Sequence, residues 1–196
     1  MLKKLANYAI NQFLKIMKLT SLKVNQKNMK WGEGFICDYK TQISTYGNSL
    51  LIGRNVYLRS NPKNYHAGMP FPTTILIDKP GAQCSIGDFC RINGVYIHAQ
   101  KSIKIGNNCV IASGVNIIDS NGHVLMSKNR TKGRDEPKEI VIGDNVWIGL
   151  NSIILKDTVI GDNSVVAAGS VVKGRFPSNV LIQGNPAKVI SELKFE

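Results

Sequence analysis

Residues 142–172 read IGDNVWIGLNSIILKDTVIGDNSVVAAGSVV, and an aliphatic residue returns at every sixth position. The aliphatic positions are Ile142, Ile148, Ile154, Ile160, Val166 and Val172, and four residues after each of the first five come Val146, Ser152, Thr158, Ser164 and Ser170. A period of six fits neither an α-helix nor an isolated strand, so it indicates a repeat architecture.

The corners of this repeat are also visible in the sequence. Gly143-Asp144-Asn145 recurs eighteen residues later as Gly161-Asp162-Asn163. Eighteen residues are three hexads, which suits a triangular coil in which each hexad is a short strand and a turn. Glycine and asparagine tolerate the positive φ that such tight corners require. The sequence therefore predicts an all-β fold, a parallel β-helix prism filled by the aliphatic and small positions.

The period can be followed backwards through the chain and divides it into three parts. We expect the β-helix to span residues 31–175, with segments ejected at 59–73 and 119–141, and a C-terminal extension at 176–196. The first ejected segment contains three prolines, and the second is rich in charged residues and lacks inward aliphatic positions. Long loops on a rigid scaffold commonly hold functional groups.

Residues 1–30 carry seven lysines and no acidic residue. Their apolar positions follow the i, i+3, i+4 rule of an amphipathic helix and include Leu2, Leu5, Ile10, Phe13 and Met17. Polar residues interrupt any apolar run, which argues against a signal peptide or a membrane span. Two interpretations stay open: the helix packs on the prism or a neighbouring subunit, or residues 1–18 lie on anionic lipid. The expected location is cytoplasmic, with peripheral contact to the inner membrane face in the second case.

The formal net charge of +12 favours partners that carry phosphate or carboxylate groups. Nucleic acid is not expected, because there is no helix-turn-helix pattern, zinc-finger spacing or basic stripe with interleaved aromatics. The cysteines form no C-x-x-C pair, and Cys84, Cys90 and Cys109 fall at the small inward position, so we expect buried free thiols.

The hexads from Ile142 to Val172, together with Gly184-Asn-Pro-Ala-Lys188, resemble the hexapeptide-repeat acyltransferases. The resemblance is strongest to the maltose, galactoside and capsular polysaccharide O-acetyltransferases, and it covers roughly residues 85–190. It implies a left-handed β-helix that works as a homotrimer, with acetyl-coenzyme A (acetyl-CoA) bound between neighbouring prisms and no metal. Residues 1–84 match weakly.

The resemblance assigns the general base to His123, a histidine just after a glycine in the second ejected segment. The chemistry is reasonable in itself, because an imidazole with an ordinary pKa of about 6.5 is largely neutral near pH 7.5 and can accept a hydroxyl proton. A solvated loop histidine is the alternative.

The cofactor site is also carried over from the resemblance. Trp147 matches a tryptophan beside the acetyl thioester, although trimer packing would also explain an outward tryptophan. A backbone N–H at Gly149 or Leu150 would contact the thioester carbonyl. Ala168 would lie along the pantetheine arm. Lys173 and Lys188 match, or neighbour, residues that bind the cofactor phosphates, and Arg175 could substitute.

Asn93 and Asp119 are the expected substrate-binding residues. Asn93 aligns with a sugar-binding asparagine of the family but also suits a hexad corner. Asp119 would hold a sugar hydroxyl or orient His123, and Asp-Ser-Asn-Gly is also ordinary turn chemistry.

The expected function is transfer of an acetyl group from acetyl-CoA to a sugar hydroxyl, within a surface or capsular polysaccharide. The alternatives are an N-acetyltransferase acting on an amino sugar or amino acid, and a xenobiotic (antibiotic) acetyltransferase. A γ-class carbonic anhydrase is disfavoured, since His66, His98 and His123 have no paired zinc-ligand spacing.

Overall fold

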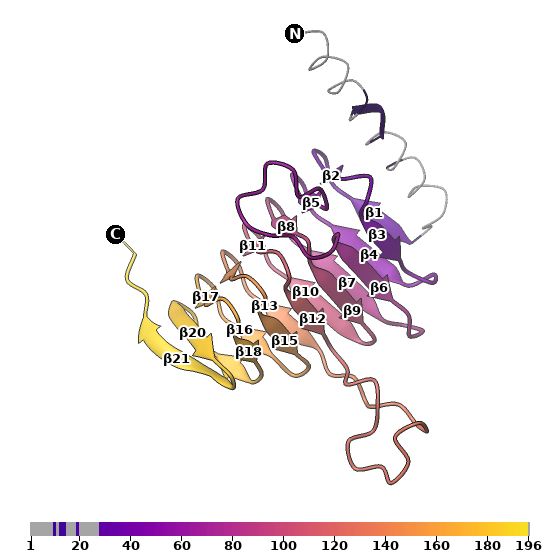
Figure 1. Ribbon diagram of the computed structural model, residues 1–196, viewed down its shortest axis with the longest axis vertical. Helices are drawn as coiled ribbons and strands as arrows, with labels where there is room; N and C mark the ends of the chain where they lie inside the picture. The colour runs from indigo at the N-terminus through magenta and orange to yellow at the C-terminus, as the bar shows by residue number, and fades with distance from the viewer. Residues whose placement is uncertain (1–9, 11, 15–18, 20–27, 196) are drawn as a thin grey trace.

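The structure is a computed structural model, and it describes residues 10, 12–14, 19 and 28–195. From Met29 onward the chain winds into coils of three short strands, and successive strands join three sheets in turn (Figure 1). The coils stack through parallel ladders into a three-sided left-handed β-helix, which confirms the predicted fold class.

The strands fall into three sheets, named here A, B and C. Sheet A contains β1 (Met29–Trp31), β4 (Ser49–Ile52), β7 (Gln83–Ile86), β10 (Ser102–Ile105), β13 (Ile140–Ile142), β16 (Val159–Ile160) and β19 (Arg175–Phe176). Sheet B contains β2 (Ile36–Cys37), β5 (Tyr57–Arg59), β8 (Arg91–Asn93), β11 (Val110–Ile111), β14 (Trp147–Ile148), β17 (Val165–Val166), β20 (Val180–Gly184) and β21 (Ala187–Glu192). Sheet C contains β3 (Gln42–Ser44), β6 (Thr74–Ile77), β9 (Tyr96–Ala99), β12 (Asn116–Ile118), β15 (Ile153–Leu155) and β18 (Val171–Val172).

The interior is filled by the residues that the period of six selects. The six aliphatic positions from Ile142 to Val172 and the five residues that follow them by four places are all buried. Cys84, Cys90 and Cys109 are buried and free, as predicted, and so is Cys37. Removing each such aliphatic side chain from water stabilises the fold by roughly 1.5–3 kcal/mol, so the stacked inner rows dominate its stability.

The corner between sheets A and B is held by a ladder of glycine and Asx residues. A Cβ atom on Gly106 would lie 2.6 Å from the carbonyl carbon of Gly143 in the next coil, so this position excludes larger residues. The Asp144 Oδ1 accepts the backbone N–H of Asn107 at 2.7 Å, and Asn145 turns the corner with a φ of 54°. The predicted stacking of the Gly-Asp-Asn motifs is confirmed.

Two segments leave the prism, at different corners. Residues 60–73, named here the strap, connect β5 in sheet B to β6 in sheet C and therefore leave at the B/C corner. Residues 119–139, named here the outer loop, connect β12 in sheet C to β13 in sheet A and leave at the C/A corner, where they project from the prism (Figure 1). Both are slightly shorter than predicted, because Arg59, Ile140 and Val141 belong to strands.

The parallel ladders extend on both sides of the predicted range 31–175. They begin at Met29, and β19 and β20 still pair in parallel with β16 and β17. The chain then turns back at Asn185-Pro186, which is a cis peptide bond, and β21 runs antiparallel to β20.

Residues 10, 12–14 and 19 adopt helical conformation, and Ile10 and Phe13 are exposed. The rest of the predicted amphipathic segment, including almost all of residues 1–18, lies outside the described residues. No helix in the described part of the chain is long and apolar enough to cross a membrane.

Candidate functional site

Trp147 stands in a row of outward side chains on sheet B. Its ladder partners are Val110 in the preceding coil and Val165 in the following one. Trp147 is 55% exposed. Its backbone N–H donates to the Ser164 carbonyl at 3.0 Å and holds the residue in the ladder. A large ring held outward by a rigid ladder forms a raised edge beside the B/C corner.

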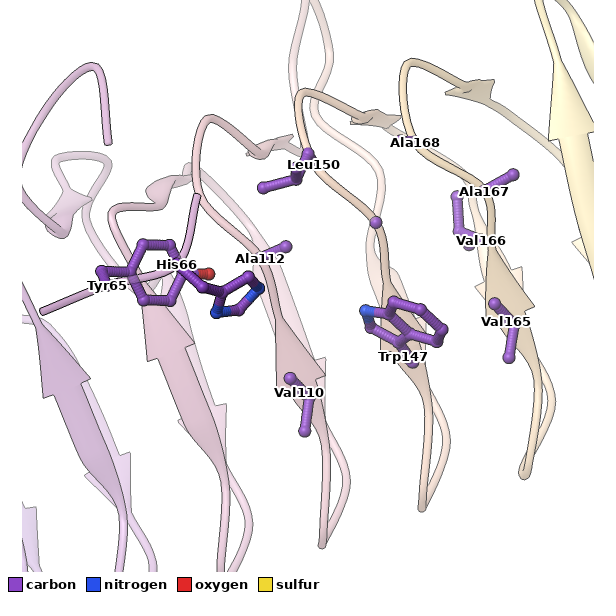
Figure 2. Close-up of a pocket in the computed structure, with 11 residues that line it drawn as sticks. Tyr65, His66, Val110, Ala112, Trp147, Leu150, Val165, Val166, Ala167 and Ala168 are labelled. Atoms are coloured by element: carbon purple, nitrogen blue, oxygen red, sulfur yellow. The ribbon is translucent and has the colours of Figure 1, made fainter. Parts of the chain in front are cut away.

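An apolar groove of about 360 Å³ runs along this edge (Figure 2). Its walls come from sheet B, the B/C corner and the strap: Tyr65, His66, Val110, Ala112, Trp147, Gly149, Leu150, Val165, Val166, Ala167 and Ala168. Tyr65 and His66 lie at one end, Ala167 and Ala168 at the other, and Trp147 stands between them. The structure therefore brings together four of the six predicted cofactor residues.

The backbone at Gly149 and Leu150 determines what the groove can bind. A Cβ atom on Gly149 would lie 2.6 Å from the Ala168 nitrogen, so the coils approach closely here only because the residue is glycine. The Gly149 N–H already donates to the Val166 carbonyl at 2.8 Å. Within the described part of the chain, no acceptor is seen for the Leu150 N–H, and the same holds for Ala168 in the next coil, so both are donors available at this corner.

The strap is firmly attached to the prism. The Asp38 carboxylate accepts the backbone N–H groups of Ser60 at 2.9 Å and Asn61 at 3.0 Å, at the start of the segment. At its end, the Thr73 hydroxyl donates to the Arg59 carbonyl at 2.6 Å. The middle is tied down by the Ser113 hydroxyl, which donates to the Gly68 carbonyl.

The outer loop, by contrast, is bonded mainly to itself and to the C/A corner. Its limbs are joined where the Asn121 N–H donates to Asp135 at 3.0 Å and where Arg134 donates to the Gly122 carbonyl at 3.3 Å. Asp135 also pairs with Lys156 of the prism, and this hydrogen bond lowers the pKa of Asp135. The limbs therefore form a closed neck.

His123 follows this neck and is exposed. Leu125 and Met126, two and three residues further along the loop, are exposed by 71% and 89%. Because the outer loop leaves the C/A corner whereas Trp147 lies on sheet B, the structure does not bring His123 together with Trp147 within one chain.

Asp119 fixes the point where the outer loop begins. It is completely buried, and its two oxygens accept the backbone N–H groups of Gln100, Lys101 and Ser102 at 2.7, 2.7 and 3.0 Å. Burial raises the pKa of Asp119, and these three bonds oppose that shift without cancelling it. The carboxylate is therefore committed to the backbone, not directed towards His123.

Asn93 has a similar structural position at the end of β8. It is 7% exposed, and its side-chain amide donates to the Ile111 carbonyl of the next coil at 3.0 Å. This bond makes it a link between coils at the B/C corner.

The two predicted phosphate-binding lysines lie at different corners. Lys188 on β21 is opposite Gln183 of β20, and β20 separates it from Ala167, whose N–H donates to the Ile182 carbonyl. Lys173 follows β18 at the C/A corner, near Asp157, whose pKa is lowered chiefly by its hydrogen bond with Lys138. Both lysines are exposed, and neither is among the residues that line the groove.

A second, polar pocket of about 380 Å³ lies at the base of the outer loop. Its lining comprises Asp78, Lys79, Pro80, His98, Gln100, Gly122, Arg134 and Asp135. Asp78 Oδ1 is bonded to His98 Nε2 and Gln100 Nε2, each at 3.0 Å. Burial raises the pKa of Asp78, but these bonds outweigh it and the net shift is downward, so the carboxylate stays ionised.

Sequence reasoning missed the strap residues of the groove and the lining of this polar pocket. His98 and His66 were considered only as zinc ligands. A count of hexads assigns Asp78 and His98 to sheet C near the C/A corner, so the sequence could have predicted that they lie near the outer loop. No periodic pattern in the sequence indicates that Tyr65 and His66 of the strap lie against the groove.

The comparisons with known proteins agree with this geometry. A family model described as bacterial transferase hexapeptide (six repeats) matches residues 139–174. The galactoside O-acetyltransferase of Escherichia coli K12 is 40% identical over 149 residues, which is 76% of this chain and 57% of that protein. Protein CapG of Staphylococcus aureus is 43% identical over 122 residues, covering 60% of this chain and 70% of CapG.

A crystal structure of a galactoside acetyltransferase in complex with coenzyme A aligns with a TM-score of 0.56 and 27% identity, covering 86% of this chain and 68% of that one. The chain spans between 56% and 58% of the length of three curated relatives that it matches. With its hexad core, its three parallel sheets and these relatives, the chain belongs to the hexapeptide-repeat acyltransferase family.

Proposed function

We propose that this chain transfers an acetyl group from acetyl-CoA to a hydroxyl group of a sugar, within a surface or capsular polysaccharide. The observation that carries the proposal is the groove at the B/C corner, where Trp147 and Leu150 of one coil converge with Ala168 of the next. The names of the relatives support a sugar acceptor, since one matched protein is a galactoside O-acetyltransferase.

The groove fits a thioester with a long flexible arm. Its lining is almost entirely apolar, and the small side chains of Ala167 and Ala168 allow close approach at one end. The Leu150 N–H supplies a donor for a carbonyl oxygen, and Lys188 lies beyond the alanines, where a phosphate would meet it. Such a fixed N–H stabilises the negative charge that develops on a thioester oxygen during acyl transfer.

The complete site requires a second subunit. His123 lies on a loop that leaves the C/A corner, and the groove follows the B/C corner of the same prism. Leu125 and Met126 beside His123 are apolar and exposed, as expected for a loop tip that packs against another surface. In a homotrimer of parallel prisms, the outer loop of one subunit would reach the groove of the next.

In this arrangement His123 acts as general base. Its imidazole accepts the proton of the acceptor hydroxyl while that oxygen forms a bond with the thioester carbonyl carbon. The Leu150 N–H of the neighbouring subunit donates to the carbonyl oxygen as it gains charge. The carbon–sulfur bond then breaks, and the proton held by His123 passes to the leaving thiolate.

The polar pocket at the base of the outer loop is the proposed acceptor site. Gly122, which directly precedes His123, forms part of its lining. Among the described residues, the side-chain bonds to Asp78 both fall on Oδ1, so Oδ2 can accept a hydrogen bond from a sugar hydroxyl. Arg134 and Lys79 add positive charge, which suits an acceptor that carries a carboxylate. Asp119 contributes indirectly, by fixing the corner from which the loop starts.

Subunit mixing tests the shared site. A cyclic trimer that contains both His123→Ala and Trp147→Ala subunits has one interface where an intact His123 faces an intact Trp147. Random assembly from equal amounts therefore restores about a quarter of the wild-type activity, whereas a site within one chain would restore none. Activity is followed as acetyl addition to glycans by mass spectrometry, with each variant alone as the control. Sedimentation of the unmixed protein checks the trimer.

The acceptor class is tested with the wild-type protein. Sugars with only hydroxyl groups, amino sugars, amino acids and antibiotics are incubated with acetyl-CoA, and the products are treated with mild base, which removes O-acetyl but not N-acetyl groups. Base-labile acetylation of a sugar is the expected result. Acetylation confined to amines, or to an antibiotic, would contradict the proposal.

A further inference from the structure

The strap closes one end of the groove, and this gives it a role beyond the proposed chemistry. Tyr65 and His66 form the end wall, with their ring centroids 4.9 Å apart (Figure 2). The other end, at Ala167 and Ala168, has no comparable barrier of large side chains. A long arm can therefore leave the groove only past the alanines, and whatever lies at its tip points towards the strap.

This wall is built from stacked, anchored groups. The Arg59 guanidinium lies 5.0 Å from the Tyr57 ring centroid and 5.5 Å from that of Tyr65, so it is sandwiched between the two rings. The Tyr57 hydroxyl donates to Asp38 at 3.1 Å, the same carboxylate that holds the start of the strap. Burial, reinforced by Asp38, raises the pKa of Tyr57 to about 12, so this phenol stays protonated and keeps donating.

The far side of the strap is fixed to the coils beneath. Ser113 holds the Gly68 carbonyl, and Met69 packs over Gly94, where a Cβ atom would lie 2.5 Å from the methionine Cγ. The strap therefore crosses the B/C corner in contact with two successive coils before it returns to sheet C. The position of the end wall follows from these contacts, since the strap has little freedom to retreat when a longer group enters.

We propose that Tyr65 and His66 limit the length of the acyl group that the groove accepts. They would make the protein selective for acetyl over longer acyl groups. This inference rests on the proposed function, because it takes the thioester to lie beside Trp147 and Leu150. Beyond that point the space towards the strap is bounded by Val110, Ala112 and the two strap rings. An acetyl methyl group fits between Trp147 and the wall, and each further methylene must displace a ring.

The test measures binding by titration calorimetry, using coenzyme A, acetyl-CoA and butyryl-CoA without an acceptor. Tyr65→Ala/His66→Ala opens the wall, and we expect the affinity for butyryl-CoA relative to acetyl-CoA to rise about 10-fold, since each methylene buried contributes about 0.8 kcal/mol. His66→Trp fills the space instead and should weaken acetyl-CoA more than coenzyme A itself. Lys63→Ala, on the same strap but outside the groove lining, is the matched control.

The outcomes separate this inference from the function on which it rests. If all three ligands bind the wild type but every variant keeps the wild-type preference, the acyl-length role is overturned and the proposed function stands. If the variants leave these affinities unchanged but raise the KM for the sugar in the acetyl-transfer assay, the wall faces the acceptor and the inference is equally overturned. If neither coenzyme A nor its thioesters bind the wild-type protein, the proposed function fails and takes the inference with it.

Discussion

The strap and the outer loop are both ejected from the same prism, and both begin beside a buried aspartate. Asp38 accepts two backbone N–H groups where the strap starts, and Asp119 accepts three where the outer loop starts. The strap then returns onto its own coils, whereas the outer loop projects away from them (Figure 1). The same type of anchor thus supports two different segments. The strap lines the groove of its own prism, whereas the outer loop extends away from its own prism.

Of the substitutions that distinguish the two segments, His123→Ala in the outer loop should have the largest effect on activity. If this imidazole is the general base, kcat should fall by about 10²- to 10⁴-fold. The variant should keep the wild-type melting temperature and oligomeric state, because the side chain is exposed. Lys132→Ala, exposed in the same loop, should keep full turnover in the same acetyl-transfer assay. Near-full activity of His123→Ala would refute the assignment.

Asp119→Ala tests whether the start of the outer loop depends on its carboxylate. The substitution leaves three backbone N–H groups without their acceptor, and we expect the free energy of unfolding to fall by about 3 kcal/mol. Asp119→Asn, which keeps an acceptor oxygen, should lose less. Urea denaturation measures both. Asp157→Asn removes the charge of an exposed pair with Lys138 and keeps a residue suited to the φ of 67° at that position, so it should change the stability less than either Asp119 substitution.

Ser113→Ala makes the corresponding test on the strap, with a smaller effect. Loss of the hydrogen bond to Gly68 should reduce stability by about 1 kcal/mol and free the middle of the strap. Limited proteolysis should then cut faster near Lys63, while the rate of cleavage near Lys132 stays unchanged. Equal acceleration at both places would mean that the two segments are not independent.

The neck of the outer loop should respond to acid. The pKa of Asp135 is lowered from its ordinary value of 3.8, chiefly by Lys156, so its contribution is present above pH 3.8 and is lost as the pH falls through the lower folded value. A dye on Lys132→Cys reports this as a decrease in anisotropy below that pH, since the native cysteines are buried. Adding Asp135→Asn should abolish the pH dependence.

The sequence predicted the parts of the molecule whose geometry is local. The period of six determines which side chains point inward, so the burial of Ile142 and Ser152 followed directly from their spacing. The groove was predicted in part, because Trp147, Gly149, Leu150 and Ala168 lie on consecutive coils. The strap was not, because the contact between Ser113 and Gly68 joins residues 45 apart and leaves no periodic trace.

Residue type is least informative at the corners. An asparagine or aspartate there can bind a ligand or cap the backbone, and both uses favour the same side chain. Asn93 and Asp119 are both buried, with their hydrogen bonds directed to backbone groups. The sequence also does not state which corner faces which in an assembly, so the partnership of His123 with a groove stays a prediction.

The antiparallel return of β21 onto β20 bears on how such a prism avoids polymerising. Each earlier strand of sheet B pairs in parallel with the strand of the next coil. Without β21, the outer edge of β20 would be open to a parallel strand from another copy of the chain. By doubling back, the last strand occupies that edge in the opposite direction, so sheet B no longer presents a parallel template. Truncation before Asn185 should therefore expose a growing tip and favour end-to-end fibres.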